Sequence, residues 1–201
     1  MDDPELRGLF EANRAWAASM VESDPGFFAG LVDVQRPSYL WIGCADSRVP
    51  ANEIIGLPPG MVFVHRNVAN QVAKGDVNCL AVLQYALEVL QIRHVIVTGH
   101  YGCGGVGAAL GPPLEGPLES WLEPLRELAA AHRRELEAED DDGRRVDRLC
   151  ELNVAAQVER VCTTAFARAA WERGQPLAVH GWIYRLNDGL LHDLEVTRTS
   201  P

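Results

Sequence analysis

The chain has 201 residues, enough to bury a sizeable core, and its 47% hydrophobic and 23% charged content is ordinary for a soluble globular domain. Its net charge of −10 argues against a nucleic-acid partner, although arginines can still line a local anion pocket. No apolar run approaches membrane-spanning length, and the first residues lack the basic and apolar regions of a signal peptide, so we expect no membrane partner and a cytoplasmic location.

Hydrophobic patterning predicts one α/β domain over residues 1–201, in which a central, mostly parallel β-sheet is flanked by helices. Helices are expected near 4–22 and 26–34, which make residues 1–35 an amino-terminal helical arm, and strands near 39–43 and 61–65. A helix near 76–92 has apolar residues at core spacing, and a strand near 94–99 follows it. Long helices are predicted over 117–138 and 145–174. The carboxyl end predicts an antiparallel edge hairpin, with strands 177–184 and 189–196 joined at Asn187-Asp-Gly189.

Two of the predicted strands lead into residues that bind metal ions. The run Tyr39-Leu-Trp-Ile42 precedes Cys44-Ala-Asp-Ser-Arg48, and His94-Val-Ile-Val-Thr98 precedes His100-Tyr-Gly-Cys103. Continuous apolar runs are typical of buried parallel strands, whose carboxyl ends commonly carry ligands and chemistry. The segments together offer a complete set of zinc ligands, so we expect one Zn2+ per chain. The candidate ligands are Cys44, Asp46, His100 and Cys103.

Cys103 stands at the predicted start of a helix, where free backbone N–H groups favour a thiolate. The segment Gly102-Cys-Gly-Gly-Val-Gly107 also matches the G-x-G-x-x-G pattern of dinucleotide-binding sites, but the strand and ribose-binding acid expected after it are missing. The other three cysteines fall in helical apolar patterns, which indicates core residues. These are Cys79, Cys150 and Cys162.

The motifs Cys44-Ala-Asp-Ser-Arg48 and His100-Tyr-Gly-Cys-Gly-Gly105 resemble the two signature motifs of the β-class carbonic anhydrases, and Val62-Phe-Val-His-Arg-Asn-Val-Ala-Asn70 is similar to the same family. The resemblance extends from about Leu6 to about Val196. It implies a zinc lyase that converts carbon dioxide reversibly to bicarbonate and a proton by attack of zinc-bound hydroxide. It also implies a homodimer, often paired again into a tetramer, in which the apolar amino-terminal arm wraps around a second subunit.

Asp46 and Arg48 are the predicted catalytic pair. If Arg48 holds Asp46 as a carboxylate, Asp46 can accept the hydroxide hydrogen and direct a lone pair at carbon dioxide. A merely structural ion pair is the alternative. The resemblance further places Gln35, Val68 and Tyr85 around the substrate, with Tyr85 contributed across the dimer.

Within the family, the chain resembles the subclass that binds bicarbonate at a second, non-catalytic site. The corresponding residues are Trp41, Val49, Arg66 and Tyr184. In this hypothesis bicarbonate opens the pair of Asp46 with Arg48, Asp46 becomes the fourth zinc ligand, and bicarbonate and low pH inhibit. The plain alternative makes Trp41 a core residue and Arg66 an interface ion-pair partner.

Two other functions fit the same residues. If Asp46 completes the zinc shell, the site has no room for water, which is typical of a zinc-binding or redox-sensing protein without hydratase activity. Arg48 favours the enzyme, because it gives Asp46 a partner other than zinc. A related hydrolase that acts on carbon disulfide is the third possibility.

Overall fold

The computed structural model of the chain describes residues 3–32 and 35–201. They belong to two compact units, Met1–Arg36 and Pro37–Pro201, which we call the amino-terminal unit and the core unit and describe separately. Among the described residues, no helix combines the length and the apolar character needed to cross a membrane.

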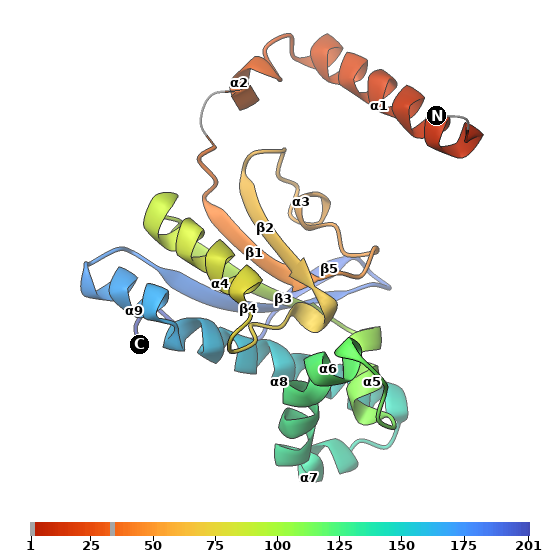
Figure 1. Ribbon diagram of the computed structural model, residues 1–201, viewed down its shortest axis with the longest axis vertical. Helices are drawn as coiled ribbons and strands as arrows, with labels where there is room; N and C mark the ends of the chain where they lie inside the picture. Colours follow the sequence, from red (N-terminus) through yellow and green to blue (C-terminus); the bar gives the residue numbers. More distant parts are fainter. Residues whose placement is uncertain (1–2, 33–34) are drawn as a thin grey trace. The chain divides into compact units, whose positions relative to one another are not determined.

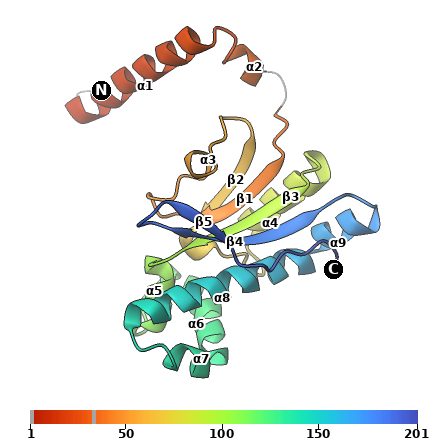
Figure 2. The same ribbon diagram turned by 180° about the vertical axis from the view of Figure 1, so that it is seen from behind.

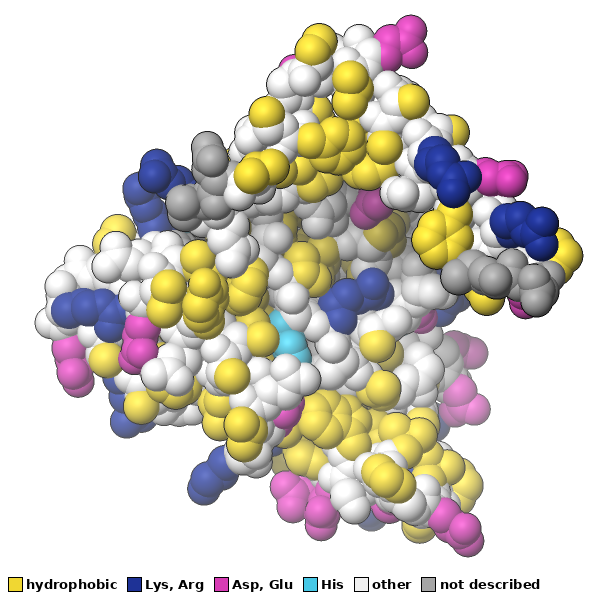
Figure 3. Space-filling view, turned by 45° about the horizontal axis from the view of Figure 1, so that its top comes forward, with side chains coloured by type: hydrophobic (Ala, Val, Ile, Leu, Met, Phe, Trp, Pro, Cys, Tyr) yellow, Lys and Arg dark blue, Asp and Glu magenta, His cyan; other side chains and the backbone are white. Residues whose placement is uncertain are grey.

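The amino-terminal unit consists of two helices, and none of its described residues is buried. Helix α1 (Pro4–Ser23) begins where expected, because Asp3 accepts the Glu5 N–H through Oδ1 at 2.9 Å and Pro4 takes the first helical position. Helix α2 (Ala29–Val32) is shorter than the helix expected over 26–34, whose last two residues lie outside the described part. No α1 residue is buried, and hydrophobic side chains cover much of the unit's surface (Figure 3). The large exposed ones are Leu6, Leu9, Phe10, Trp16, Val21, Leu31 and Val32.

The core unit is built on a five-stranded sheet of order β2-β1-β3-β4-β5 (Figure 1). Its strands are β1 (Tyr39–Cys44), β2 (Val62–Asn67), β3 (His94–His100), β4 (Ala178–Arg185) and β5 (Leu190–Asp193). The first four run parallel, and β5 pairs antiparallel with β4. Strands β1 and β3 are buried almost throughout, as their continuous apolar runs predict. The predicted mostly parallel sheet with an antiparallel edge hairpin is therefore confirmed.

Helices cover the two sheet faces unequally. Helices α4 (Val77–Gln84), α8 (Asp142–Thr163) and α9 (Ala165–Glu172) share one apolar cluster with β1 and β3, and Figure 2 shows α8 running along this side of the sheet. Within the described core unit, the opposite cluster, around Trp41 and Ile96, is covered by the short helix α3 (Ala51–Ile54). A third cluster joins the carboxyl ends of the central strands to α8 and to three further helices. These are α5 (Gly104–Leu110), α6 (Pro117–Ala131) and α7 (Arg133–Glu137).

Three expected helices are interrupted. The helix expected over 117–138 breaks between α6 and α7 at His132, and the helix expected over 145–174 breaks at Thr164. Thr164 is extended, and its hydroxyl accepts the Ala167 N–H at 3.2 Å, so it caps α9 instead of continuing α8. The helix expected over 76–92 changes at Tyr85 into a π-helical turn, η2 (Tyr85–Val89). Strand β5 ends before residue 196, because Glu195 takes a left-handed conformation with φ 58°.

Candidate active site

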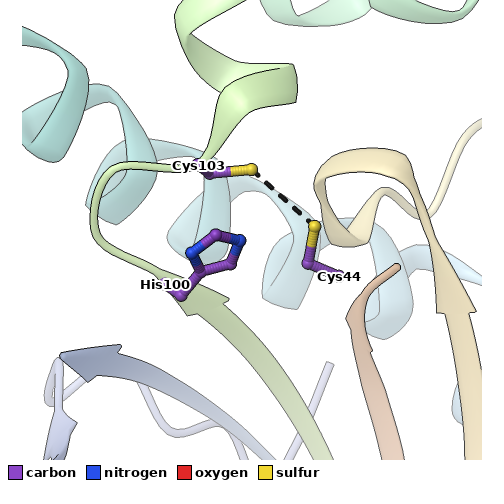
Figure 4. A group of neighbouring side chains, drawn as sticks. All are labelled: Cys44, His100 and Cys103. Carbon is purple, nitrogen blue, oxygen red and sulfur yellow. Dashed lines mark hydrogen bonds between the residues drawn. The ribbon is translucent and has the colours of Figure 1, made fainter. Parts of the chain in front are cut away.

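Three predicted ligands meet at the carboxyl ends of two paired strands (Figure 4). Cys44 is the last residue of β1, His100 is the last residue of β3, and Cys103 is the residue before α5. Their ligand atoms lie within 4.8 Å of one another, and all three side chains are buried. The structure thus brings together, from segments far apart in the sequence, two thiols and one imidazole.

The arrangement of these donors fits zinc. The two sulfur atoms are 3.8 Å apart. Two zinc–sulfur bonds of about 2.3 Å at a tetrahedral angle require a separation of about 3.8 Å. His100 donates from Nδ1 to the carbonyl oxygen of Tyr101 at 3.1 Å, which leaves the Nε2 lone pair free. That Nε2 atom is buried and has no hydrogen-bond partner among the described residues, as expected of a metal ligand.

The sulfur atoms of Cys44 and Cys103 differ in acidity. The hydrogen bond with Cys103 holds the pKa of the Cys44 thiol well below its usual range, although burial opposes this shift. The same contact and burial raise the pKa of Cys103. Of the two sulfur atoms, Cys44 is thus the more readily deprotonated. Burial raises the pKa of the remaining thiols to about 12, about 12 and about 11, which suits core residues; these are Cys79, Cys150 and Cys162.

Asp46 and Arg48 form a bidentate ion pair beside the three ligands. Strand β1 ends at Cys44, and a turn brings the pair together: the backbone N–H of Arg48 donates to Asp46 Oδ1 at 2.9 Å. Arg48 also donates from Nε to Oδ1 at 3.0 Å and from Nη2 to Oδ2 at 2.7 Å. These bonds keep the pKa of Asp46 well below its usual range. Oδ2 lies 3.7 Å from His100 Nε2, yet Asp46 is outside the ligand group found among the described residues.

Arg66 has a role that the sequence did not indicate. From β2 it donates through Nε to the carbonyl oxygen of Cys44 at 2.7 Å, and through Nη2 to the carbonyl oxygen of Asp46. The backbone on both sides of the turn is thereby tied to a neighbouring strand. No spacing in the sequence could have shown this, because it depends on the register that pairs Gly43 with Arg66.

The other predicted regulatory residues lie on the same sheet face. Trp41, Val49 and Tyr184 belong to one apolar cluster, where Trp41 and Val49 are fully buried. The Trp41 indole lies over Gly43, since a Cβ at position 43 would stand 2.3 Å from its Nε1 atom. This Nε1 atom is buried without a hydrogen-bond partner among the described residues, and so is Oγ1 of Thr98, a residue that the sequence did not single out.

The three residues predicted around the substrate lie on three different parts of the chain. Val68 is 38% exposed in the short 3-10 helix η1 (Val68–Asn70), whose first two residues approach Gly105 of α5. Tyr85 is 43% exposed, and the centroid of its ring lies 5.8 Å from the centroid of the Phe63 ring. Gln35 belongs to the amino-terminal unit, so its position relative to the zinc ligands stays a prediction.

A second group of potential ligands appears away from this site. His65, Asp76 and Cys79 each offer a ligand atom within 4.8 Å of the others. Asn67 donates to His65 Nε2 at 3.2 Å, and its orientation is fixed because the same amide accepts from Gln71 N and donates to Gln71 O. His65 therefore carries its proton on Nδ1, while Asp76 caps α4. With neither imidazole nitrogen free, the group is explained as packing, as the sequence predicted for Cys79.

Comparison with known proteins agrees with this geometry. The family model of carbonic anhydrase matches residues 39–191, which include the three ligands. A carbonic anhydrase of Emericella nidulans is 50% identical over 188 residues, covering 94% of this chain and 82% of that protein. The structure of a Coccomyxa β-carbonic anhydrase in complex with acetazolamide superimposes with a TM-score of 0.94 and 40% identity, over 100% of this chain and 90% of that one. The structure of one of the tetrameric β-carbonic anhydrases of Sordaria macrospora superimposes with a TM-score of 0.93 and 38% identity, over 98% of this chain and 100% of that one. This chain belongs to the β-class carbonic anhydrases, which are zinc enzymes.

Proposed function

We propose that the chain hydrates carbon dioxide reversibly to bicarbonate and a proton, with one zinc ion held by Cys44, His100 and Cys103. The observation that carries the proposal is the bidentate pair of Asp46 with Arg48 beside the Nε2 atom of His100, which no described residue hydrogen-bonds. Zinc, when bound, makes a coordinated water acidic enough to act as a nucleophile near neutral pH, chemistry for which carbonic anhydrases are themselves the standard example.

Asp46 is suited to orient that nucleophile. A carboxylate oxygen has about two lone-pair sites. Oδ1 of Asp46 uses both for the two N–H groups of Arg48, whereas Oδ2 accepts one hydrogen bond and keeps one site open. Oδ2 is also the oxygen that lies 3.7 Å from His100 Nε2. The free lone pair therefore faces the ligands, where it can accept a hydrogen and hold the reacting oxygen in one orientation.

The thiolates set the strength of the metal as an acid. Two thiolates cancel the charge of a zinc ion, whereas three neutral histidines leave it intact, so zinc held here is a weaker Lewis acid than zinc held by three histidines. Orientation by Asp46 and an alkaline operating pH compensate for this. We expect activity to rise toward alkaline pH.

The direct test is stopped-flow hydration of carbon dioxide at several pH values, with the zinc content measured on the same sample. Hydration by a protein with about one zinc per chain supports the proposal. Full zinc content without hydration would favour the zinc-binding or redox-sensing alternative. Turnover of carbon disulfide, offered in the same assay, would favour the related hydrolase.

Inhibition by bicarbonate and low pH is part of the proposal. Directly paired residues of parallel strands point to the same sheet face, and the register places Trp41, Arg66 and Tyr184 on one face. Arg66 holds the carbonyl oxygens of Cys44 and Asp46, so a bicarbonate ion that competes for its guanidinium would loosen the turn and open the pair of Asp46 with Arg48. The buried Nε1 of Trp41 and Oγ1 of Thr98, which have no hydrogen-bond partner in the described part of the chain, could donate to the same anion. Val49 contributes apolar packing.

Bicarbonate inhibition of two variants tests this second site. Trp41→Phe and Tyr184→Phe each remove one polar hydrogen and should weaken inhibition without a loss of zinc. Trp171→Phe is the matched control, since Trp171 Nε1 donates to Leu177 O from α9. Equal bicarbonate inhibition and a simple one-proton pH profile in all proteins would exclude the second site and leave the zinc chemistry intact.

We also propose a homodimer or a dimer of dimers, in which the amino-terminal unit docks on a second copy. The exposed apolar side chains of α1 and α2 support this proposal. The sheet face around Trp41 also supports it, since α3 is the helix that covers this face among the described residues of the core unit. In such an assembly Tyr85 would reach the substrate of a neighbouring subunit. Light scattering of Leu9→Glu should show a smaller particle than the wild type, with Glu11→Gln as the control. An unchanged mass would refute docking through this part of α1.

A further inference from the structure

One short loop, residues 68–71, touches every element that carries a zinc ligand. Its 3-10 helix η1 packs against β1, β3 and α5, which end at Cys44, end at His100 and begin after Cys103. Ala69 lies in the same buried cluster as Cys44 and Cys103. The fit against α5 is close, because a Cβ added at Gly105 would stand 2.7 Å from a methyl group of Val68 and 3.3 Å from the Cβ of Ala69. A shift of this loop would therefore disturb the frame that spaces the ligands.

The loop adopts a backbone conformation that is unfavourable for Ala69. Ala69 has φ 62° and Asn70 has φ 45°, two consecutive left-handed residues of which neither is glycine. Both side chains are buried. Such a conformation persists only when surrounding contacts hold it.

Two buried amides of α8 provide these contacts. Asn153 donates from Nδ2 to the carbonyl oxygen of Ala69 at 2.9 Å. Gln157, one turn later, donates from Nε2 to Asn153 Oδ1 at 2.8 Å and accepts the Val72 N–H through Oε1 at 2.8 Å. The two side chains are 0% and 2% exposed. One continuous line of hydrogen bonds thus ties the left-handed residue and the residue after the loop to a 22-residue helix.

The far ends of the loop are held from other elements. Trp121 of α6 donates from Nε1 to Val68 O at 2.8 Å, and Asn67 pairs with both backbone groups of Gln71 at 2.7 Å. These bonds fix where the loop starts and stops, whereas the carbonyl of Ala69 itself depends on Asn153. The α8 amides are therefore the contacts closest to the left-handed bend.

We propose that Asn153 and Gln157 are positioning residues of the zinc site, which hold the 68–71 loop in its left-handed form and so fix the spacing of the three ligands. The inference rests on the proposed function, because it assigns the amides to the metal site of that reaction. Both residues act through the loop. Uncharged amides suit this depth, since a charge buried here would lose its hydration without a counter-ion.

Metal binding provides the test. Asn153→Ala and Gln157→Met should each weaken zinc affinity about tenfold in competition with a chelator, at the low end of what loss of an outer-shell contact costs. Both should also shift the thiolate-to-cobalt bands of the cobalt(II)-loaded protein, because these bands follow the geometry of the two sulfur atoms. Val161→Ala is the control. It opens a cavity on the buried side of α8, within the apolar cluster that α8 shares with α4 and α9 and that contains no zinc ligand. It should lower the unfolding free energy and leave both the zinc affinity and the cobalt bands unchanged.

Unchanged zinc affinity and unchanged cobalt spectra in both amide variants would overturn the inference and leave Asn153 and Gln157 as fold residues only. Should Asn153→Ala fail to fold, Gln157→Met decides alone, because it keeps the side-chain volume and the bond from Asn153 to Ala69. A wild-type protein that binds zinc but hydrates no carbon dioxide would refute the proposed function, while the metal readouts would still judge the amides.

Discussion

Replacing Asp46 by asparagine separates catalysis from metal binding. The substitution keeps the shape of the side chain, but an amide NH2 would replace Oδ2 and face the Arg48 Nη2 donor at 2.7 Å. Two donors cannot share that contact, so either the amide turns over and presents its NH2 to the Arg48 backbone N–H, or Arg48 leaves. In the first case the amide oxygen takes the Oδ2 place, but the NH2 opposes the two Arg48 donors that held Oδ1; in the second case the Arg48 bonds are lost altogether. In both cases the carboxylate charge is gone and the acceptor near the ligands is no longer held in one orientation. Loss of one preorganised contact of this kind lowers kcat by about 10²- to 10³-fold, or about 2.7–4 kcal/mol of barrier.

The assay is stopped-flow carbon dioxide hydration with zinc measured on the same protein. Asp46→Asn should retain about one zinc per chain, since Cys44, His100 and Cys103 are untouched. Glu53→Gln makes the same chemical change at an exposed position on α3 and should leave turnover unchanged. Hydration by Asp46→Asn at nearly the wild-type rate, with zinc bound, would refute the role of the carboxylate.

Three more predictions concern other parts of the molecule, and a fourth concerns pH. Cys103→Ser should lose zinc, measured by metal analysis, because serine supplies no thiolate; full occupancy would remove Cys103 from the ligand set. Arg66→Ala removes two charged hydrogen bonds and should lower kcat at least about tenfold, whereas unchanged hydration would deny the backbone clamp a role. Leu83→Ala, at a fully buried site on α4, should lower the urea unfolding free energy by about 2–5 kcal/mol, and a loss well below this range would contradict the packing. Arg48 depresses the pKa of Asp46, so the stability that this pair contributes is complete above the unfolded pKa of about 3.9 and is lost as pH falls through the lower folded pKa. The difference in urea unfolding free energy between the wild type and Asp46→Asn should therefore stay constant from about pH 8 to about pH 5. A change in this difference near neutral pH would contradict the prediction.

The sheet was predictable because its signals are local. The central strands β1 and β3 are short apolar runs, and the carboxyl-terminal hairpin has its own turn sequence at Asn187-Asp-Gly189. The helix breaks at His132 and Thr164 were missed because the apolar pattern continues across them, while capping by Thr164 depends on one hydroxyl. A periodicity argument does not detect such a switch.

Within the candidate site, too, the features with a local sequence signal were predicted and those that depend on distant contacts were missed. Cys44, His100 and Cys103 stand next to strand ends, so topology alone brings them together. The clamp from Arg66 to Cys44 and the bond from Asn153 to Ala69 join residues 22 and 84 positions apart. They depend on sheet register and on how α8 crosses the sheet, and neither leaves a local pattern in the sequence. The sequence therefore marked Arg66 only as a candidate regulatory residue, through the family resemblance, and neither hydrogen bond was predicted.

The residues of the site fall into two groups, one buried in the core and one held by hydrogen bonds near the surface. The three ligands and residues 69–71 of the loop are buried among strands and α8, so freeing them requires a large part of the core to open. Asp46 lies instead in a turn after β1, held by an Arg48 side chain that is 61% exposed and by the exposed Arg66. Contacts of this kind open at low free-energy cost, because water replaces the lost hydrogen bonds. In the proposed regulation, an anion that competes for these arginines would therefore act on the carboxylate while the zinc ligands keep their geometry.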